Sequence, residues 1–166
     1  MNGAGPDGAG SAGERAHFAA LENLYRAAPI NHLFRSRLEI VEAGVARIHF
    51  TVDERVFHAA GAAHGTIYFK MLDDAAFYAA NSLVSDRFLL TTAFNLLLTR
   101  PMKAGPAVAQ GRWVSGRRRV MVADAHMLDA SGEEVARGTG TFMRSHFPLS
   151  SLSGYAVATT APAPAG

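Results

Sequence analysis

One long apolar segment, residues 64–83, limits most strongly the folds that this chain can adopt. It is the only long helix candidate within the expected domain, and small residues would let a sheet approach it on more than one side: Ala75, Ala76, Ala79 and Ala80. Two strand patterns precede this segment and four strand-like runs follow it. A single apolar helix beside so much sheet predicts an α+β fold, in which a curved antiparallel sheet wraps around the helix.

Alternating apolar and polar residues predict the strands. Residues 37–40 and 47–52 show this alternation, and the Ala43-Gly44 turn between them indicates a hairpin. Turn signals containing Gly, Pro or Ser separate the later strands, which we expect to form an antiparallel meander. These runs are residues 88–101, 106–116, 118–129 and 133–145. Three strand glycines leave room for close packing on the sheet: Gly111, Gly138 and Gly140.

The ends of the chain consist mostly of Gly, Ala, Ser and Pro, so we expect disordered tails over residues 1–13 and 151–166. Helical spacing over residues 14–27 predicts an N-terminal helix, and residues 14–150 form the single expected domain. We find neither a signal peptide nor an apolar run long enough to span a bilayer. The expectation is therefore a cytoplasmic protein with no membrane partner.

The composition excludes several kinds of chemistry. There is no cysteine among the 166 residues, which rules out disulfides, thiolate nucleophiles and cysteine zinc sites. A formal net charge of +2 is too mild to indicate nucleic-acid binding. The chain also lacks a P-loop, a dinucleotide fingerprint and a Gly-x-Ser-x-Gly motif. We therefore expect no cofactor and no nucleic-acid partner.

Two adjacent carboxylates, Asp73 and Asp74, stand in the middle of the apolar helix. A carboxylate in apolar surroundings costs free energy unless it is paired, hydrogen-bonded or protonated, and such placement often marks chemistry. A structural ion pair between Asp73 and a strand arginine is the competing interpretation. Asp74 points about 100° away from Asp73, and we expect it to be the structural residue of the two.

Gly65 opens the helix, where the first N–H groups are unpaired and can stabilise an oxyanion. An ordinary helix-start glycine is the alternative. The nine-residue step from His64 to Asp73 turns roughly 900° and rises about 13.5 Å, so these residues lie on opposite faces. Asp73 therefore cannot reach the Gly65 amide of its own helix. It could meet the Gly65 of a second copy if two helices pack antiparallel about a two-fold axis.

His58 and His64 do not have a usual zinc spacing and lack an evident third ligand. We therefore favour a polar lining of a cleft over a metal site. Thr91 begins the strand that follows the helix, where its hydroxyl could hydrogen-bond the carboxylate or a water. Simple strand propensity would also explain a threonine there.

Over roughly residues 30–145, the chain resembles the hot-dog fold acyl-CoA thioesterases, specifically the phenylacetate-pathway-like group related to 4-hydroxybenzoyl-CoA thioesterase. The likeness rests on an acidic residue nine positions after the histidine of a His-Gly-Gly-like motif. The matching positions are His64-Gly65-Thr66, Asp73, Arg100-Pro101 and Gly138-x-Gly140. Two positions depart from the family pattern: Thr66 replaces the second glycine, and His58 replaces the usual Asn or Gln.

This resemblance implies that Asp73 acts as nucleophile or as base for water, and that the Gly65 amide polarises the thioester carbonyl. His58 and Thr91 would orient water. It also implies a site shared between subunits, hence a homodimer or homotetramer acting on an acyl-CoA. The acyl group and the CoA phosphates would contact residues along and beside the helix: His64, Thr66, Tyr68, Phe69, Phe77, Arg100, Lys103 and Arg117 to Arg119.

Two other functions remain open on the same fold. One is a non-catalytic protein that binds acyl-CoA or an acyl carrier protein. The other is a dehydratase or hydratase of acyl thioesters, which commonly uses an Asp followed five residues later by a His. We expect that pairing to be absent and rank this function third.

Overall fold

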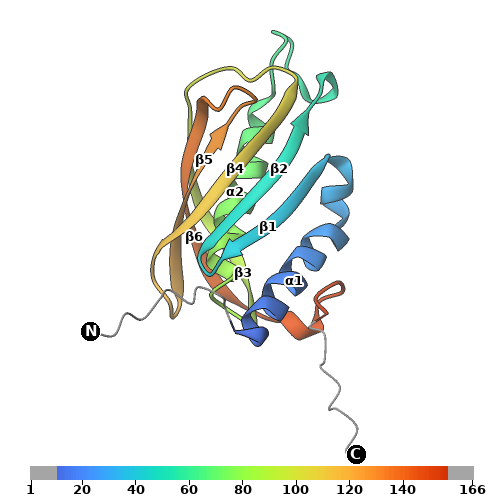
Figure 1. The fold of residues 1–166 in the computed structure, drawn as a ribbon. Coiled ribbons are helices and arrows are strands. Elements are labelled where there is room, and N and C mark those ends of the chain that lie inside the picture. Colours follow the sequence, from blue (N-terminus) through green and yellow to red (C-terminus); the bar gives the residue numbers. More distant parts are fainter. Residues whose placement is uncertain (1–10, 157–166) are drawn as a thin grey trace, which may run out of the picture.

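The apolar segment forms helix α2, Gly65–Asn81, and a six-stranded antiparallel sheet curls around it in the computed structural model, which describes residues 11–156 (Figure 1). The predicted α+β fold is confirmed. The strands are β1 (Ser36–Glu42), β2 (Val45–Val52), β3 (Arg87–Leu98), β4 (Gly105–Ser115), β5 (Val120–Leu128) and β6 (Glu134–Pro148). The other elements are helix α1 (Ala12–Ala27) and the short 3-10 helices η1 (Pro29–Leu33), η2 (Glu54–Val56) and η3 (Leu149–Ser151).

The strand order is β1-β2-β4-β5-β6-β3, so the expected meander of the last four strands is wrong in one respect. Strand β3 pairs with β6 at one edge of the sheet, and β4 pairs with β2. The connection over residues 99–104 is longer than a hairpin turn and lets the chain cross from one edge to the middle of the sheet. Local turn signals cannot reveal such a long-range pairing.

Small residues let the sheet lie directly on the backbone of α2. Ala75, Ala76, Ala79 and Ala80 are all fully buried. A Cβ atom added at Gly111 of β4 would lie 2.7 Å from the Ala76 nitrogen and closer still to the Ala75 carbonyl. The predicted close approach at this glycine is therefore confirmed, and it fixes how α2 sits in the sheet.

The two edges of the sheet differ. Helix α1 packs beside β1, and the Ile40 N–H donates a 2.8 Å hydrogen bond to Glu22 Oε1. No described element covers β3 at the other edge (Figure 1). This strand exposes 45% of Leu90, 57% of Leu97 and 47% of Leu98. A long, open, apolar edge is a surface that another chain can pair with.

Both ends of the described chain pack on the domain. Helix α1 begins at Ala12, two residues before the predicted range, and Ser11 caps it. Near the other end, Tyr155 Oη lies 2.7 Å from His17 Nδ1 of α1. The rest of the two predicted tails, residues 1–10 and 157–166, lies outside the described residues. Within residues 11–156, no helix is both long and apolar enough to cross a bilayer.

Candidate active site

Asp73 lies on the side of α2 that faces β3. Thr91 Oγ1 of β3 donates to both carboxylate oxygens, at 3.0 Å to Oδ1 and 3.3 Å to Oδ2. Burial raises the pKa of Asp73 to about 6, the neighbouring Asp74 charge adds to the rise, and the Thr91 hydrogen bond opposes it. Among residues 11–156 no arginine forms an ion pair with Asp73. A carboxylate that titrates near neutral pH is suited to take a proton from a substrate or water.

Asp74 points to the side of α2 that faces η1 and is paired structurally, as the sequence suggested. It forms an ion pair with Lys70, one helical turn earlier. Lys70 Nζ also donates to Asn31 Oδ1 of η1 at 2.7 Å. Sequence reasoning did not identify Lys70, although its spacing of four residues from Asp74 is the spacing of helical ion pairs.

The N-terminus of α2 presents a free backbone donor. His64 caps the helix, and its Nδ1 accepts the Thr66 N–H at 3.2 Å. The predicted ligand contacts His64 and Thr66 thus bond to each other. The Gly65 N–H donates to no group in the part of the chain that the structure describes. The positive end of the helix dipole adds to this donor, so the site can hold a developing negative charge.

A pocket of about 270 Å³ opens beside Gly65. It brings together four predicted residues: His58, Gly65, Tyr68 and Arg100. The residues that sequence reasoning missed complete the wall: Ala63, Leu98, Thr99 and Pro101. Pro101 was noted in sequence only as part of the Arg100-Pro101 pair, and the other three carry no sequence signal for a site, so the fold reveals them.

Two of the expected substrate contacts, Tyr68 and Arg100, form hydrogen bonds and an ion pair within the wall of this pocket. Tyr68 is buried, and its hydroxyl donates to the Arg100 carbonyl at 3.0 Å and accepts from the Met102 N–H at 2.7 Å. The Arg100 guanidinium pairs with Glu133 at 2.7 Å. Tyr68 therefore fastens the segment after β3 to α2, and Arg100 meets a ligand only if it leaves Glu133.

The His58 ring is fixed by its own turn. Its Nδ1 accepts the Ala60 N–H at 3.1 Å. In the neutral ring, the tautomer assigned from that bond carries its proton on Nε2. His58 thus presents an N–H donor to the pocket, which is what an Asn or Gln amide would also offer.

The remaining expected contacts lie apart from this pocket. Phe77 is buried in the core, with its ring 5.0 Å from that of Phe88 and 5.9 Å from that of Phe142. Lys103 Nζ donates to the Gly61 carbonyl at 3.1 Å. The Arg117 guanidinium stacks on the Trp113 ring, 4.8 Å from its centroid.

The expectation that the hydratase pairing is absent is wrong, because Asp53 and His58 have this spacing. The structure gives these two residues separate environments. Asp53 caps η2 and binds Arg55 through both carboxylate oxygens, and it faces a different pocket from His58. Within one chain, this acid and this histidine therefore face different pockets, and Asp53 is engaged with Arg55.

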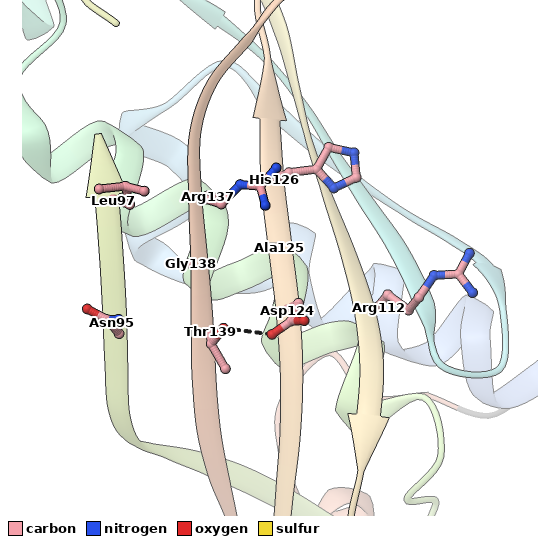
Figure 2. Close-up of a pocket in the computed structure, with 9 residues that line it drawn as sticks. All are labelled: Asn95, Leu97, Arg112, Asp124, Ala125, His126, Arg137, Gly138 and Thr139. Atoms are coloured by element: carbon pink, nitrogen blue, oxygen red, sulfur yellow. Dashed lines mark hydrogen bonds between the residues drawn. The ribbon is translucent and has the colours of Figure 1, made fainter. Parts of the chain in front are cut away.

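A further hollow of about 430 Å³ lies on the outer face of the sheet, away from α2 (Figure 2). It is polar, and Thr139 Oγ1 donates to Asp124 at 2.7 Å across its floor (Figure 2). It contains none of the predicted site residues. Between residues 11 and 156, no three His, Asp or Glu side chains are grouped to hold a metal ion.

Asp73 does not line the Gly65 pocket. The two residues are eight positions apart on α2, which separates them by about 12 Å along the axis. One chain therefore carries a carboxylate half-site and an amide half-site on a single helix. The wrapped sheet and this helix define a protein of the hot-dog class.

Comparison with known proteins gives the family. The model of the thioesterase superfamily matches residues 60–136. A relative named "Putative esterase" from Sulfurisphaera tokodaii is 30% identical over 112 residues, covering 65% of this chain and 83% of the relative. A similarly named protein of Saccharolobus solfataricus is 29% identical, covering 63% of this chain and 70% of the relative. The chain belongs to the thioesterase superfamily.

Solved structures agree on the fold. The Escherichia coli PaaI protein, from the phenylacetic acid degradation operon, superimposes with a TM-score of 0.75 over 82% of this chain and 99% of its own, at 19% identity. A thioesterase family protein from Silicibacter pomeroyi gives a TM-score of 0.71 over 77% of this chain and 97% of its own, at 23% identity. The hot-dog fold and the PaaI-like resemblance indicated by the motif are confirmed.

Proposed function

We propose that this protein is an acyl-CoA thioesterase with a site shared between two copies of the chain. The observation that carries the proposal is the pair of half-sites on α2. Asp73 is a partly buried carboxylate with a raised pKa and one hydroxyl partner, and Gly65 offers an unpaired amide beside a pocket. A base and an oxyanion donor are the two groups that thioester hydrolysis requires.

The positions of the half-sites support a specific two-fold axis. On α2, Phe69 lies midway between Gly65 and Asp73. On β3, Leu98 lies beside Gly65 and Thr91 lies beside Asp73. Phe94 is next to the point midway between Leu98 and Thr91 along this strand. The rings of Phe69 and Phe94 are in contact, with centroids 5.7 Å apart.

A two-fold axis beside this aromatic pair would bring Asp73 of each copy to Gly65 of the other. The same operation would pair the open edge of β3 antiparallel with its copy and cover its exposed leucines. Phe69, now 45% exposed, would be buried at the centre of the contact. One arrangement thus completes the site and covers the open edge of the sheet.

In the proposed reaction, Asp73 takes a proton from a water molecule as the water oxygen attacks the thioester carbonyl carbon. The Gly65 amide of the other copy stabilises the negative charge on the carbonyl oxygen. The C–S bond then breaks, CoA leaves as a thiolate and receives the proton from Asp73, and a free carboxylic acid remains. Direct attack by Asp73 on the carbonyl, followed by hydrolysis of the anhydride, uses the same two groups.

The His58 N–H faces the same pocket as Gly65 and would add a second donor to the carbonyl oxygen or orient the water. Thr91 would keep the Asp73 carboxylate in place. The acyl group would lie near Phe69, where the two copies meet. The CoA phosphates would meet basic side chains near the pocket, with Arg100 in its wall and Lys103, bound to the Gly61 carbonyl, as candidates.

The test is a panel of aromatic and aliphatic acyl-CoA substrates, assayed by release of free thiol, with Asp73→Asn as the inactive reference. We expect thiol release that depends on Asp73. Tight binding of the same acyl-CoAs without thiol release would instead identify a non-catalytic binder. Addition of water to an enoyl-CoA, without thiol release, would identify a hydratase. Either result would overturn the proposal.

A further inference from the structure

A buried charged cluster lies behind Asp73, on the side of α2 that faces α1 and η1. Lys70 and Asp74 form its ion pair, and their side chains are only 17% and 18% exposed. The Lys70 ammonium also donates to Asn31 and lies 5.4 Å from the centroid of the Tyr25 ring and 5.7 Å from that of Phe34. Three elements of the fold thus converge on one charged pair.

Stability alone does not account for such a pair. Taking two charges out of water costs free energy, and replacing a buried ion pair by apolar residues is often neutral or stabilising. The thioesterase family match begins at residue 60, whereas Tyr25 and Asn31 precede it. The N-terminal segment therefore contributes a feature that lies outside the matched region.

The pair is directly coupled to the proposed base, because Asp74 is the next residue after Asp73. The Asp74 charge raises the pKa of Asp73 and the Lys70 charge lowers it. These are the two charged groups that act on Asp73, and both belong to α2; β3 contributes the uncharged hydroxyl of Thr91. Burial raises the pKa of Asp74, and Lys70 opposes that rise by favouring the carboxylate.

We propose that the Lys70–Asp74 pair is a positioning device for catalysis, in which Lys70, itself held by Asn31, fixes the Asp74 carboxylate next to Asp73 so that its negative charge acts on the proposed base. This inference deepens the proposed function and rests on it only for the kinetic part of the test. A base is most effective when it titrates near the working pH. The pair would thus set the pH range in which the enzyme works.

The experiment compares Asp74→Asn with the wild-type protein by two readouts. One is the acid limb of the kcat/KM-versus-pH profile, and the other is the titration of the Asp73 carboxyl carbon by NMR without substrate. We expect both to move to lower pH by about one unit in Asp74→Asn, because a negative neighbour is lost and Lys70 is no longer neutralised. The rate above the limb should fall at the same time, because a weaker base takes the proton less readily.

Two further variants make the result specific. Lys70→Met combined with Asp74→Asn leaves no unpaired buried charge, so it should fold even if the single variant does not, and it should shift both readouts less in the same direction. Asp86→Asn is the matched control, since Asp86 is an exposed carboxylate paired with Arg144, and it should shift neither. Readouts that stay at the wild-type pH in folded Asp74→Asn or in the double variant would overturn the inference.

The NMR titration also separates this inference from the proposed function. If Asp73→Asn retained activity, Asp73 would not be the base and the proposed function would fail. The Asp73 titration would still report whether the pair controls that carboxylate.

Discussion

Replacing Asp73 by Asn should make the protein inactive and, at neutral pH, more stable. In the folded state burial favours the protonated carboxyl, so ionisation at pH 7.5 carries a cost that the unfolded chain does not have. The rise in the pKa of Asp73 from 3.8 to about 6 corresponds to about 3 kcal/mol. Solvent reaches part of the side chain and screens this cost, so we expect a gain of roughly 1–3 kcal/mol in the free energy of unfolding. Asn keeps the shape of the side chain and an oxygen for Thr91.

The stability difference between Asp73→Asn and the wild type should depend on pH. Since the folded pKa is raised, the folded protein holds the proton more tightly than the unfolded chain. The cost to the wild type is complete above about pH 6 and vanishes below 3.8. Urea unfolding at one protein concentration should therefore show Asp73→Asn to be more stable at pH 7.5, with a smaller difference at pH 4.5. A variant no more stable than wild type at pH 7.5, or a difference independent of pH, would refute the reasoning.

Three other predictions concern residues around the site and core. His58→Asn should retain activity within about tenfold, because an amide can replace the imidazole N–H donor. The acid limb of the kcat/KM-versus-pH profile should also remain, because Asp73 sets it; loss of this limb would assign it to His58. Burial lowers the pKa of His17 from 6.5, so wild-type stability should fall as the pH drops below 6.5, and urea unfolding of His17→Gln should show a weaker fall. Gly111→Ala should lower the free energy of unfolding by roughly 1–3 kcal/mol, because the new methyl group meets the α2 backbone at Ala75 and Ala76. Gly13→Ala, with only Ser11 Oγ within reach, should not lower it.

Much of the fold followed from local patterns in the sequence. The apolar segment and its alanines predicted α2 and its close contact with the sheet, and alternation predicted the strands. The position of β3 was not predictable in this way, because pairing between β3 and β6 depends on contacts between segments about 50 residues apart. The sequence pattern shows which face of a strand is buried but not which strand is its neighbour.

For the candidate site as well, local features could be predicted from the sequence and most tertiary contacts could not. Asp73 and Gly65 were proposed because a charge inside an apolar helix and a glycine at its start are visible in sequence. The predicted contact of Thr91 with the Asp73 carboxylate is present in the structure. The Asn31 contact to Lys70 was missed because η1 reaches α2 only through tertiary packing. Aromatic residues on a helix suit either an acyl group or a core, and sequence alone does not separate Tyr68, which lines the pocket, from Phe77, which packs in the core.

The central claim is that each site combines Asp73 of one chain with Gly65 of another. Gly65→Pro is the sharpest variant for this, because proline has no N–H and is well tolerated at the first position of a helix. The residue before it, His64, already has the extended backbone that proline requires, with φ −67° and ψ 146°. Gly65→Ala keeps the N–H and is the matched control.

The decisive measurement is thiol release by an equal mixture of Asp73→Asn and Gly65→Pro chains that have been unfolded and refolded together. Each variant alone should be inactive. Half of the mixed dimers would be heterodimers with one intact site out of two, so the mixture should recover about one quarter of wild-type activity. A mixture that stays inactive, although heterodimers are shown to form, would contradict the shared site.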